Sequence, residues 1–194
     1  MIRAFVAIPL PDDAADALEL RQAGLRVGRH VTAENFHITL CFLGNHPEPV
    51  VEDAHYALSD IRVPPLSLTI AGLGAFGDQR PRSLHAVVRP NPSLTALREK
   101  VVRAIRGAGI TLPRERFVPH VTLARFGNGG LRGEALLELQ AYTGRHMGFT
   151  LGPLPVEHFT LFESRLTGSG PIYEPLAEYP VGETAGAVWT GVPG

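Results

Sequence analysis

The chain contains one four-residue pattern twice, as His37-Ile38-Thr39-Leu40 and as His120-Val121-Thr122-Leu123. Both copies have a β-branched second residue and are flanked by phenylalanines. Successive side chains of a β-strand point to opposite faces, so residues two apart share a face. The repeat therefore predicts two strands, each with an imidazole and a hydroxyl on one face and apolar residues behind them.

The duplication favours a catalytic role for the two histidines. A single His-x-Thr on a strand is usually a structural polar face, whereas two copies with the same apolar backing supply a matched pair of titrating groups. Imidazole accepts and donates protons around neutrality, and acid–base catalysis needs two such groups on opposite sides of a reacting centre. We predict His37 and His120 as this pair, and their spacing does not assign which is the acid.

Charge and composition restrict the class of protein. The net charge is −1, so the molecule as a whole does not attract nucleic acid and any anion site must be local. The single Cys41 excludes an internal disulfide, which suits a reducing cytoplasm. No apolar run approaches the roughly 20 residues of a membrane span, so we expect a soluble, cytoplasmic protein without a membrane partner.

Hydrophobic periodicity and Gly/Pro positions predict alternating strands and helices. Helices are expected from Pro11 to Gly28 and over 48–59, 92–105 and 134–141. Strands are expected over 2–8, 66–70, 84–88, 149–151, 156–163 and 171–180, together with the two motif strands, the first of which should end at Gly44-Asn45. The segment 72–77 superficially resembles a phosphate-binding loop, but no Lys-Ser/Thr pair lies near it, and it is interpreted as a loop between strands.

The helix at 92–105 has the strongest pattern. Ser93 is expected as its N-cap, and its apolar stripe comprises Leu94, Leu97, Val101, Val102 and Ile105.

The order of these elements on either side of a midpoint near residue 80 predicts the fold class. We expect an α+β, bilobal, duplicated fold with two mainly antiparallel sheets facing a central cleft and helices outside. Residues 1–181 should form a single two-lobed domain, and residues 182–194 a flexible tail.

Four segments carry a resemblance to a known family. They are Arg3-Ala4-Phe5-Val6-Ala7-Ile8-Pro9-Leu10, the stretch from Glu34 to Gly44, the stretch from Phe117 to Arg125, and Phe159-Thr160-Leu161-Phe162-Glu163-Ser164. Together they resemble the two-histidine phosphoesterase superfamily. In particular they are similar to the RNA 2′,3′-cyclic phosphodiesterases first described as 2′-5′ RNA ligases. The resemblance extends over about residues 2–180.

The resemblance implies an activity and a set of site residues. It implies hydrolysis of the terminal 2′,3′-cyclic phosphate of RNA to a 2′-phosphate, with no metal or other cofactor. By position, His37 would be the acid and His120 the base, and Thr39 and Thr122 would hold the phosphate oxygens. Arg125 matches a family arginine of the active site. Strict alternation would turn Arg125 away from His120, so a strand end or a bulge must re-aim it.

Three alternatives stay open on the substrate side. The implied substrates are RNA ends or nucleoside 2′,3′-cyclic phosphates. The same site would also suit small cyclic nucleotides or ADP-ribose cyclic phosphate. We expect the protein to be a monomer. Formation of 2′-5′ linkages is the reverse reaction at the same residues. A non-catalytic RNA-end-binding module is the remaining class, and it has no need for two titrating histidines.

Other residues attract attention for their chemistry. We expect Cys41 to pack rather than react, and Phe5 and Phe76 to be core residues rather than stacking platforms for a base. Four loop arginines are either solvated or part of a rim that holds RNA phosphates: Arg80, Arg82, Arg114 and Arg116. The histidines outside the motifs are interpreted as surface or structural residues: His30, His46, His55, His85, His146 and His158.

Overall fold

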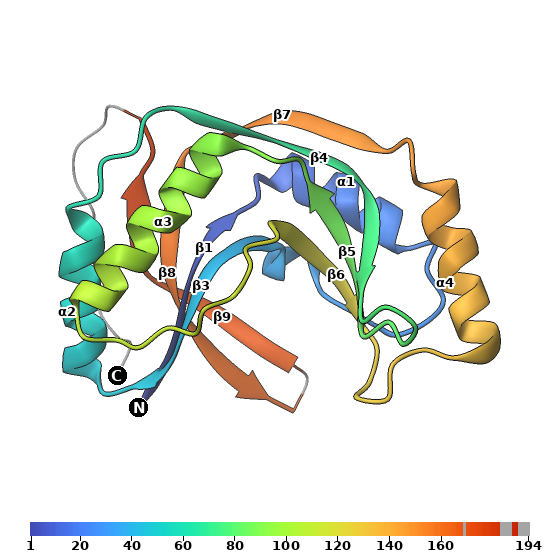
Figure 1. Cartoon of the computed structure of the whole chain (residues 1–194), viewed down its shortest axis with the longest axis horizontal. Helices are drawn as coiled ribbons and strands as arrows, with labels where there is room; N and C mark the ends of the chain where they lie inside the picture. Colours follow the sequence, from blue (N-terminus) through green and yellow to red (C-terminus); the bar gives the residue numbers. More distant parts are fainter. Residues whose placement is uncertain (169, 183–187, 190–194) are drawn as a thin grey trace.

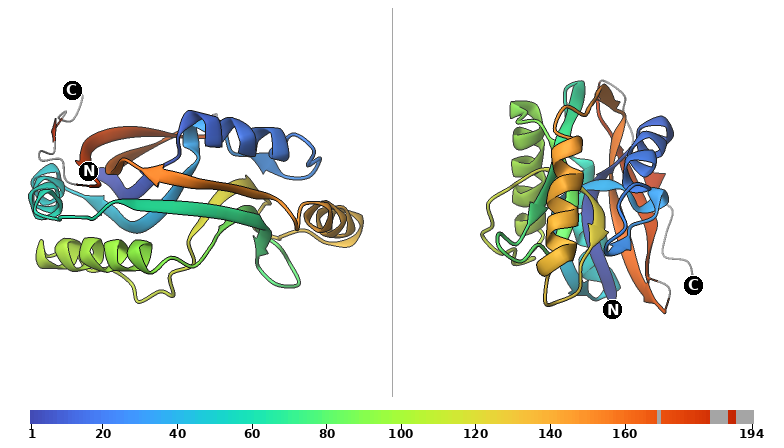
Figure 2. Two further views of the ribbon diagram at one scale, coloured as in Figure 1. Left: turned by 90° about the horizontal axis from the view of Figure 1, so that it is seen from above. Right: turned by 90° about the vertical axis from the view of Figure 1, so that its right-hand side faces the viewer.

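Antiparallel strands run through the centre of the molecule, and helices cover them on the outside (Figures 1 and 2). The structure is a computed structural model that describes residues 1–168, 170–182 and 188–189. The helices are α1 (Asp12–Gln22), α2 (Glu48–Ser59), α3 (Pro92–Gly107) and α4 (Gly133–Arg145), with a 3-10 turn at Ala33–Asn35. The strands are β1 (Ile2–Pro9), β2 (Arg29–His30), β3 (His37–His46), β4 (Leu66–Phe76), β5 (Ser83–Val88), β6 (His120–Arg125), β7 (Thr150–Val156), β8 (His158–Thr167), β9 (Gly170–Pro180) and β10 (Val188–Trp189).

The strands fall into two groups that meet at one point. Their order is β10-β9-β8-β1-β3-β6-β5-β4-β7, and β2 pairs with β6 at one side. In the described residues, β3 and β6 are paired only through Ile38 and Val121. The predicted α+β fold with antiparallel strands is therefore confirmed, but the strands form one continuous sheet instead of two, and its two parts are joined at the histidine motifs.

The two lobes are not the two halves of the sequence. The first lobe consists of β1, β3, β8 and β9 with α2 and α3, and the second of β4 to β7 with α1 and α4. Figure 2 shows α1 and α3 on opposite sides of the strands. The predicted division near residue 80 is thus wrong in detail, because β8 and β9 return to the first lobe and extend its sheet beside β1.

Helix α3 has the predicted apolar face and a different N-cap. Every residue of the predicted stripe is buried. The cap is Asn91, whose side chain accepts a hydrogen bond from the backbone N–H of Leu94 at 3.0 Å. Pro92 is the first helical residue, a position where the missing N–H costs nothing, so the cap lies before Pro92 rather than at Ser93.

Three of the element boundaries predicted from glycine positions are wrong. Strand β3 continues through Gly44, which has φ +92° and pairs with Ala4, and ends at His46. Strand β4 includes most of the segment predicted as a loop. A Cβ on Gly74 would lie 2.8 Å from Nε2 of His85. That glycine makes room for a side chain instead of forming a turn. Helix α1 ends at Gln22, before the predicted end at Gly28.

The end of the chain is described only in part. The backbone of Val188–Trp189 pairs with β9 opposite Glu178 and Ala177. The remainder of the predicted tail, apart from Gly182, lies outside the described residues. Among the described helices, none is long and apolar enough to span a bilayer.

Candidate active site at the junction of the two lobes

The pairing of Ile38 with Val121 brings the two motifs side by side. Neighbours on antiparallel strands are counted in opposite directions, so His37 falls next to Thr122 and Thr39 next to His120. All four side chains lie on the face opposite the core, because Ile38 and Val121 are completely buried. The two histidines are diagonal neighbours, a relationship in which residues across an antiparallel pair are about 7–8 Å apart.

Each motif contains a β-bulge at its leucine. Leu40 is the extra residue of β3, since Val6 pairs with Cys41 and Ala7 with Thr39. Leu123 is the extra residue of β6, since Leu84 pairs with Ala124 and His85 with Thr122. A bulge shifts the alternation of side chains by one position.

The bulges bring the residues that follow back to the site face. Leu123 and Ala124 are both buried, so Arg125 returns to the side of Thr122, as the resemblance required. Phe42 occupies the equivalent position after the first motif and is exposed. The site therefore has an arginine at one end and a phenylalanine at the other.

The carbonyl of the bulged Leu123 is held by two donors. It accepts hydrogen bonds from the backbone N–H of Val31 at 2.8 Å and from Nε2 of Gln22 at 2.6 Å. Gln22 is buried at the end of α1 and also donates to the carbonyl of Val31 at 2.7 Å. Helix α1 thus fixes the bulge that orients Arg125.

Backbone carbonyls fix the tautomer of both histidines. Nδ1 of His37 lies 2.8 Å from the carbonyl of Asn35, and Nδ1 of His120 lies 2.7 Å from the carbonyl of Val118. A carbonyl only accepts, so Nδ1 carries the proton and Nε2 has a free lone pair. The Thr39 hydroxyl lies 3.1 Å from Nε2 of His37 and donates to it.

Aromatic rings support each imidazole from its own lobe. The ring centroid of His37 is 5.0 Å from that of Phe5 and 5.2 Å from that of Tyr173, which presents its edge. The ring of His120 contacts Phe76 at 4.7 Å and His85 at 5.2 Å. Phe5 is buried, as predicted, so these rings restrict the motion of the imidazoles.

Two cavities open onto the four motif side chains. One has a volume of about 250 Å³ and is lined by His120, Thr39, Phe42, Phe76 and Phe117, among others. The other has a volume of about 290 Å³ and is lined by His37, Thr122, Arg125, Arg29 and Tyr173, among others. Each cavity thus combines the histidine of one motif with the threonine of the other.

Burial and positive charge keep both histidines neutral. Burial is the largest cause that lowers the pKa of His37 to about 4; the charges of Arg125 and His120 act in the same direction, and the hydrogen bond to the carbonyl of Asn35 opposes them. The pKa of His120 is also lowered, mainly by burial and then by Arg125, against the effect of the Val118 carbonyl. Arg125 therefore lies within electrostatic range of both rings, and the charge of His120 acts on His37.

The remaining sequence interpretations have mixed outcomes. Cys41 is partly buried, and burial raises the pKa of its thiol to about 12, so it packs as predicted. Among the four loop arginines, only Arg116 lines either histidine cavity.

His85 is more involved with the site than predicted. It is buried, its ring stacks on Phe76 at 4.1 Å, and its Nδ1 has no hydrogen-bond partner. Burial lowers its pKa to about 4, with a smaller contribution from His120.

Sequence reasoning did not identify Arg29 and Tyr173. Arg29 pairs in register with Arg125 through β2, and Tyr173 reaches His37 from β9. Neither is near a motif in the sequence.

This arrangement suits displacement at a phosphorus atom without covalent participation of the protein. Two imidazoles with unprotonated Nε2 atoms, two hydroxyl groups and one guanidinium converge on one region. A bilobal antiparallel fold with paired His-x-Thr strands at its centre is characteristic of the two-histidine phosphoesterases.

Comparison with known proteins identifies the family to which the chain belongs. It belongs to the 2′-5′ RNA ligase superfamily, which it matches over residues 9–166. It is 38% identical over 151 residues to an RNA 2′,3′-cyclic phosphodiesterase of Aeropyrum pernix, covering 76% of this chain and 83% of that one.

Two further matches agree with this family. An RNA 2′,3′-cyclic phosphodiesterase of Geobacillus stearothermophilus is 30% identical over 184 residues, which are 91% of this chain and 56% of that protein, so this chain spans little more than half of its length. The crystal structure of E. coli LigT complexed with NADP+ aligns with a TM-score of 0.74 and 25% identity, covering 94% of this chain and 98% of that one.

Proposed function

We propose that the protein hydrolyses the 2′,3′-cyclic phosphate at the end of an RNA to a 2′-phosphate, by acid–base catalysis with His37 and His120. The observation that carries the proposal is the pairing of Ile38 with Val121, which sets two tautomerically fixed imidazoles on one face. The names of the relatives from Aeropyrum pernix and Geobacillus stearothermophilus support the same substrate.

In the proposed reaction, one neutral imidazole takes a proton from water as the water oxygen attacks phosphorus. The bond from phosphorus to O3′ breaks, and the other histidine, as imidazolium, gives its proton to O3′. The products are a 2′-phosphomonoester and a free 3′-hydroxyl. The resemblance makes His37 the acid and His120 the base, and exchange with solvent restores their protons. Each transfer typically contributes about 10²–10⁴-fold.

Thr39, Thr122 and Arg125 would stabilise the charge that develops on the phosphoryl oxygens. Hydroxyl groups and a guanidinium that are already oriented toward this charge stabilise the transition state without reorganisation. Bound substrate would also bring a negative charge beside the histidines. That charge offsets the effect of Arg125 and favours protonation of the acid.

The test is turnover of a short RNA ending in a 2′,3′-cyclic phosphate by the purified protein. We expect a 2′-phosphate product, and we expect H37A and H120A each to abolish turnover while circular dichroism shows a folded protein. H158A serves as the matched control, because His158 lies on β8 and lines neither histidine cavity. If either single mutant retained most of its activity, that histidine would have no part in the mechanism.

A smaller substrate is the alternative. Cavities of about 250 and 290 Å³ are of mononucleotide scale, and the net charge of −1 provides no general attraction for RNA. Nucleoside 2′,3′-cyclic phosphates and ADP-ribose cyclic phosphate, assayed beside the RNA, distinguish the two by their kcat/KM values.

We also propose that the protein acts as a monomer in the cytoplasm. The single cysteine, which packs and does not pair, suits a reducing compartment. Sedimentation at assay concentration tests the monomer, and cell fractionation tests the location.

A further inference from the structure

A third cavity continues from the one that contains His37. It has a volume of about 380 Å³ and shares Arg29, Arg125, Pro171 and Tyr173 with the His37 cavity. Because the two cavities share walls, a ligand whose reacting end lies beside His37 has space to extend away from the catalytic residues.

Three arginines from three different strands line this cavity. Arg3 projects from β1, Arg29 from β2 and Arg125 from β6, and no acidic side chain lines it. None of the three forms an ion pair within residues 1–168, 170–182 and 188–189. We call this space the arginine cavity.

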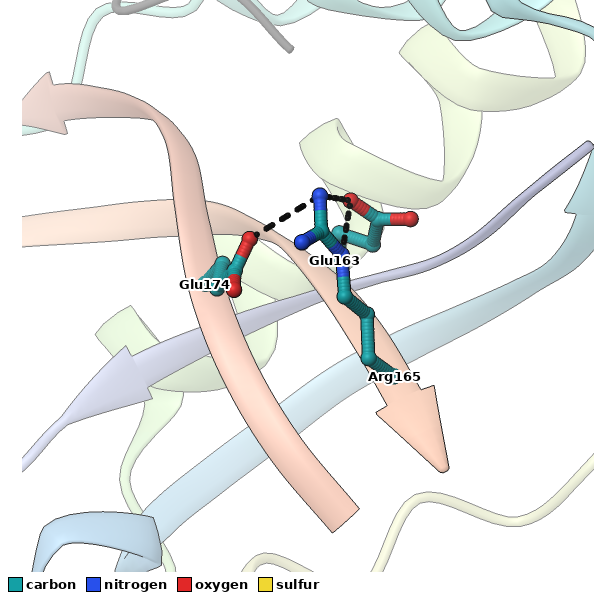
Figure 3. A network of polar contacts seen from close by, with 3 residues as sticks. All are labelled: Glu163, Arg165 and Glu174. Atoms are coloured by element: carbon teal, nitrogen blue, oxygen red, sulfur yellow. Dashed lines mark hydrogen bonds and ion pairs between the residues drawn. The ribbon is translucent and has the colours of Figure 1, made fainter. Parts of the chain in front are cut away.

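The acidic residues nearest to the arginine cavity in the sheet form ion pairs with a different arginine. Glu163 pairs in register with Ala4, directly beside Arg3. As Figure 3 shows, Glu163 and Glu174 both approach Arg165, whose Nη2 lies 3.2 Å from a carboxylate oxygen of each. These carboxylates are held by Arg165, so the guanidinium groups of the arginine cavity remain available to an external anion.

An exposed aromatic ring lies between the arginine cavity and the site. Phe42 is 61% exposed and lines both the arginine cavity and the His120 cavity. Its centroid is 5.9 Å from that of Phe5, which packs against His37. Aromatic rings next to basic side chains are the usual surface for single-stranded nucleic acid, because every base can stack on them.

We propose that the arginine cavity binds the phosphodiester that precedes the terminal nucleotide of an RNA, and that Phe42 stacks against a base of the same strand. The inference rests on the proposed function and makes the preferred substrate an oligonucleotide rather than a mononucleotide. A guanidinium matches a phosphodiester in charge and geometry, since it donates two parallel hydrogen bonds to its oxygens. Three such groups supply the local anion site that the net charge of −1 does not.

Arg3 gives the sharpest test, because it lines the arginine cavity and neither histidine cavity. We expect R3Q to lower kcat/KM about tenfold for a trinucleotide ending in a 2′,3′-cyclic phosphate, the effect of one charge-assisted hydrogen bond. Turnover of 2′,3′-cyclic AMP, which has no preceding phosphodiester, should be unchanged. The salt dependence of the trinucleotide reaction should also weaken, with a slope reduced by roughly 0.7 for one lost phosphate contact.

R103Q is the matched control, because it removes the same charge from an exposed position on α3. Equal losses on both substrates in R3Q, or no loss on the trinucleotide, would overturn the inference. Fluorescence anisotropy of a labelled trinucleotide ending in a 2′-phosphate separates this inference from the proposed function. If the wild type turns over neither substrate, the proposed function fails. A tenfold weaker Kd in R3Q would then still support the arginine cavity, and an unchanged Kd would refute it.

Discussion

Ile38 of β3 lies opposite Val121 of β6, and this pair joins the two parts of the sheet. Both side chains are completely buried, and the residues on either side of them are the histidines and threonines of the two motifs. The alignment of the site therefore depends on the packing of one apolar pair rather than on contacts between the polar groups themselves.

We predict that T39A and T122A each lower kcat by about 10²-fold, because each removes a donor to the charge that develops on phosphorus. T39S and T122S keep the hydroxyl and should retain most of the activity. Single-turnover rates on a saturating cyclic phosphate measure the effect. Equal losses in the serine and alanine variants would show that the methyl group, and hence packing, is responsible.

Arg125 should set the pH range in which the enzyme works. Its charge lowers the pKa of both His37 and His120, although burial is the larger cause for each. R125Q removes that charge, so both pKa values should rise and the pH profile of kcat/KM should move to higher pH, with a lower maximum. The profile reports the histidine pair rather than either residue. NMR titration of the imidazoles provides a direct measurement, and a profile that stays in place in R125Q would contradict the prediction.

Acid should destabilise the fold through the buried histidines. Burial lowers the pKa of His37 and of His85 to about 4, below the value near 6.5 expected in the unfolded chain. The unfolded chain therefore binds more protons between these pH values. The contribution of the two histidines to the free energy of unfolding is fully present above pH 6.5 and is lost as pH falls toward 4. Each group contributes about 3 kcal/mol at most. Urea unfolding at several pH values measures this slope.

The variant H85F should make that slope shallower, because phenylalanine can stack on Phe76 without taking up a proton. H158Q is the matched control and should keep the slope of the wild type. An unfolding free energy independent of pH between 6.5 and 4 would show that these histidines are not buried as neutral groups.

Gln22 should couple stability to activity although it lies in a helix outside the motifs. Q22A removes the side-chain hydrogen bonds to the carbonyls of Leu123 and Val31 and leaves buried acceptors less satisfied. We expect a loss of about 2 kcal/mol in the free energy of unfolding. We also expect a lower kcat/KM, since the bulge at Leu123 aims Arg125. Q140A, at an exposed position of α4, should change neither.

The apolar periodicity of the chain was a good guide to the local elements. The stripe of α3 and the bounds of α2 were predicted residue by residue, because burial of an amphipathic face is encoded in spacing alone. Glycine was less informative. Gly44 was interpreted as the end of a strand and Gly74 as part of a loop, yet both lie within strands, one at positive φ and the other facing His85. The need for space or an unusual φ arises from neighbours that the local sequence does not reveal.

By itself, the sequence determined the chemistry of the two motifs: two imidazoles and two hydroxyls, each above an apolar layer, in strands that repeat each other. Only the tertiary structure decided how these groups meet. The bulges at Leu40 and Leu123 turn Phe42 and Arg125 toward the site, and Arg29 and Tyr173 reach it from β2 and β9. The reason is physical, since alternation along a strand is a local property, whereas strand pairing, bulges and cavities depend on segments far apart in the chain.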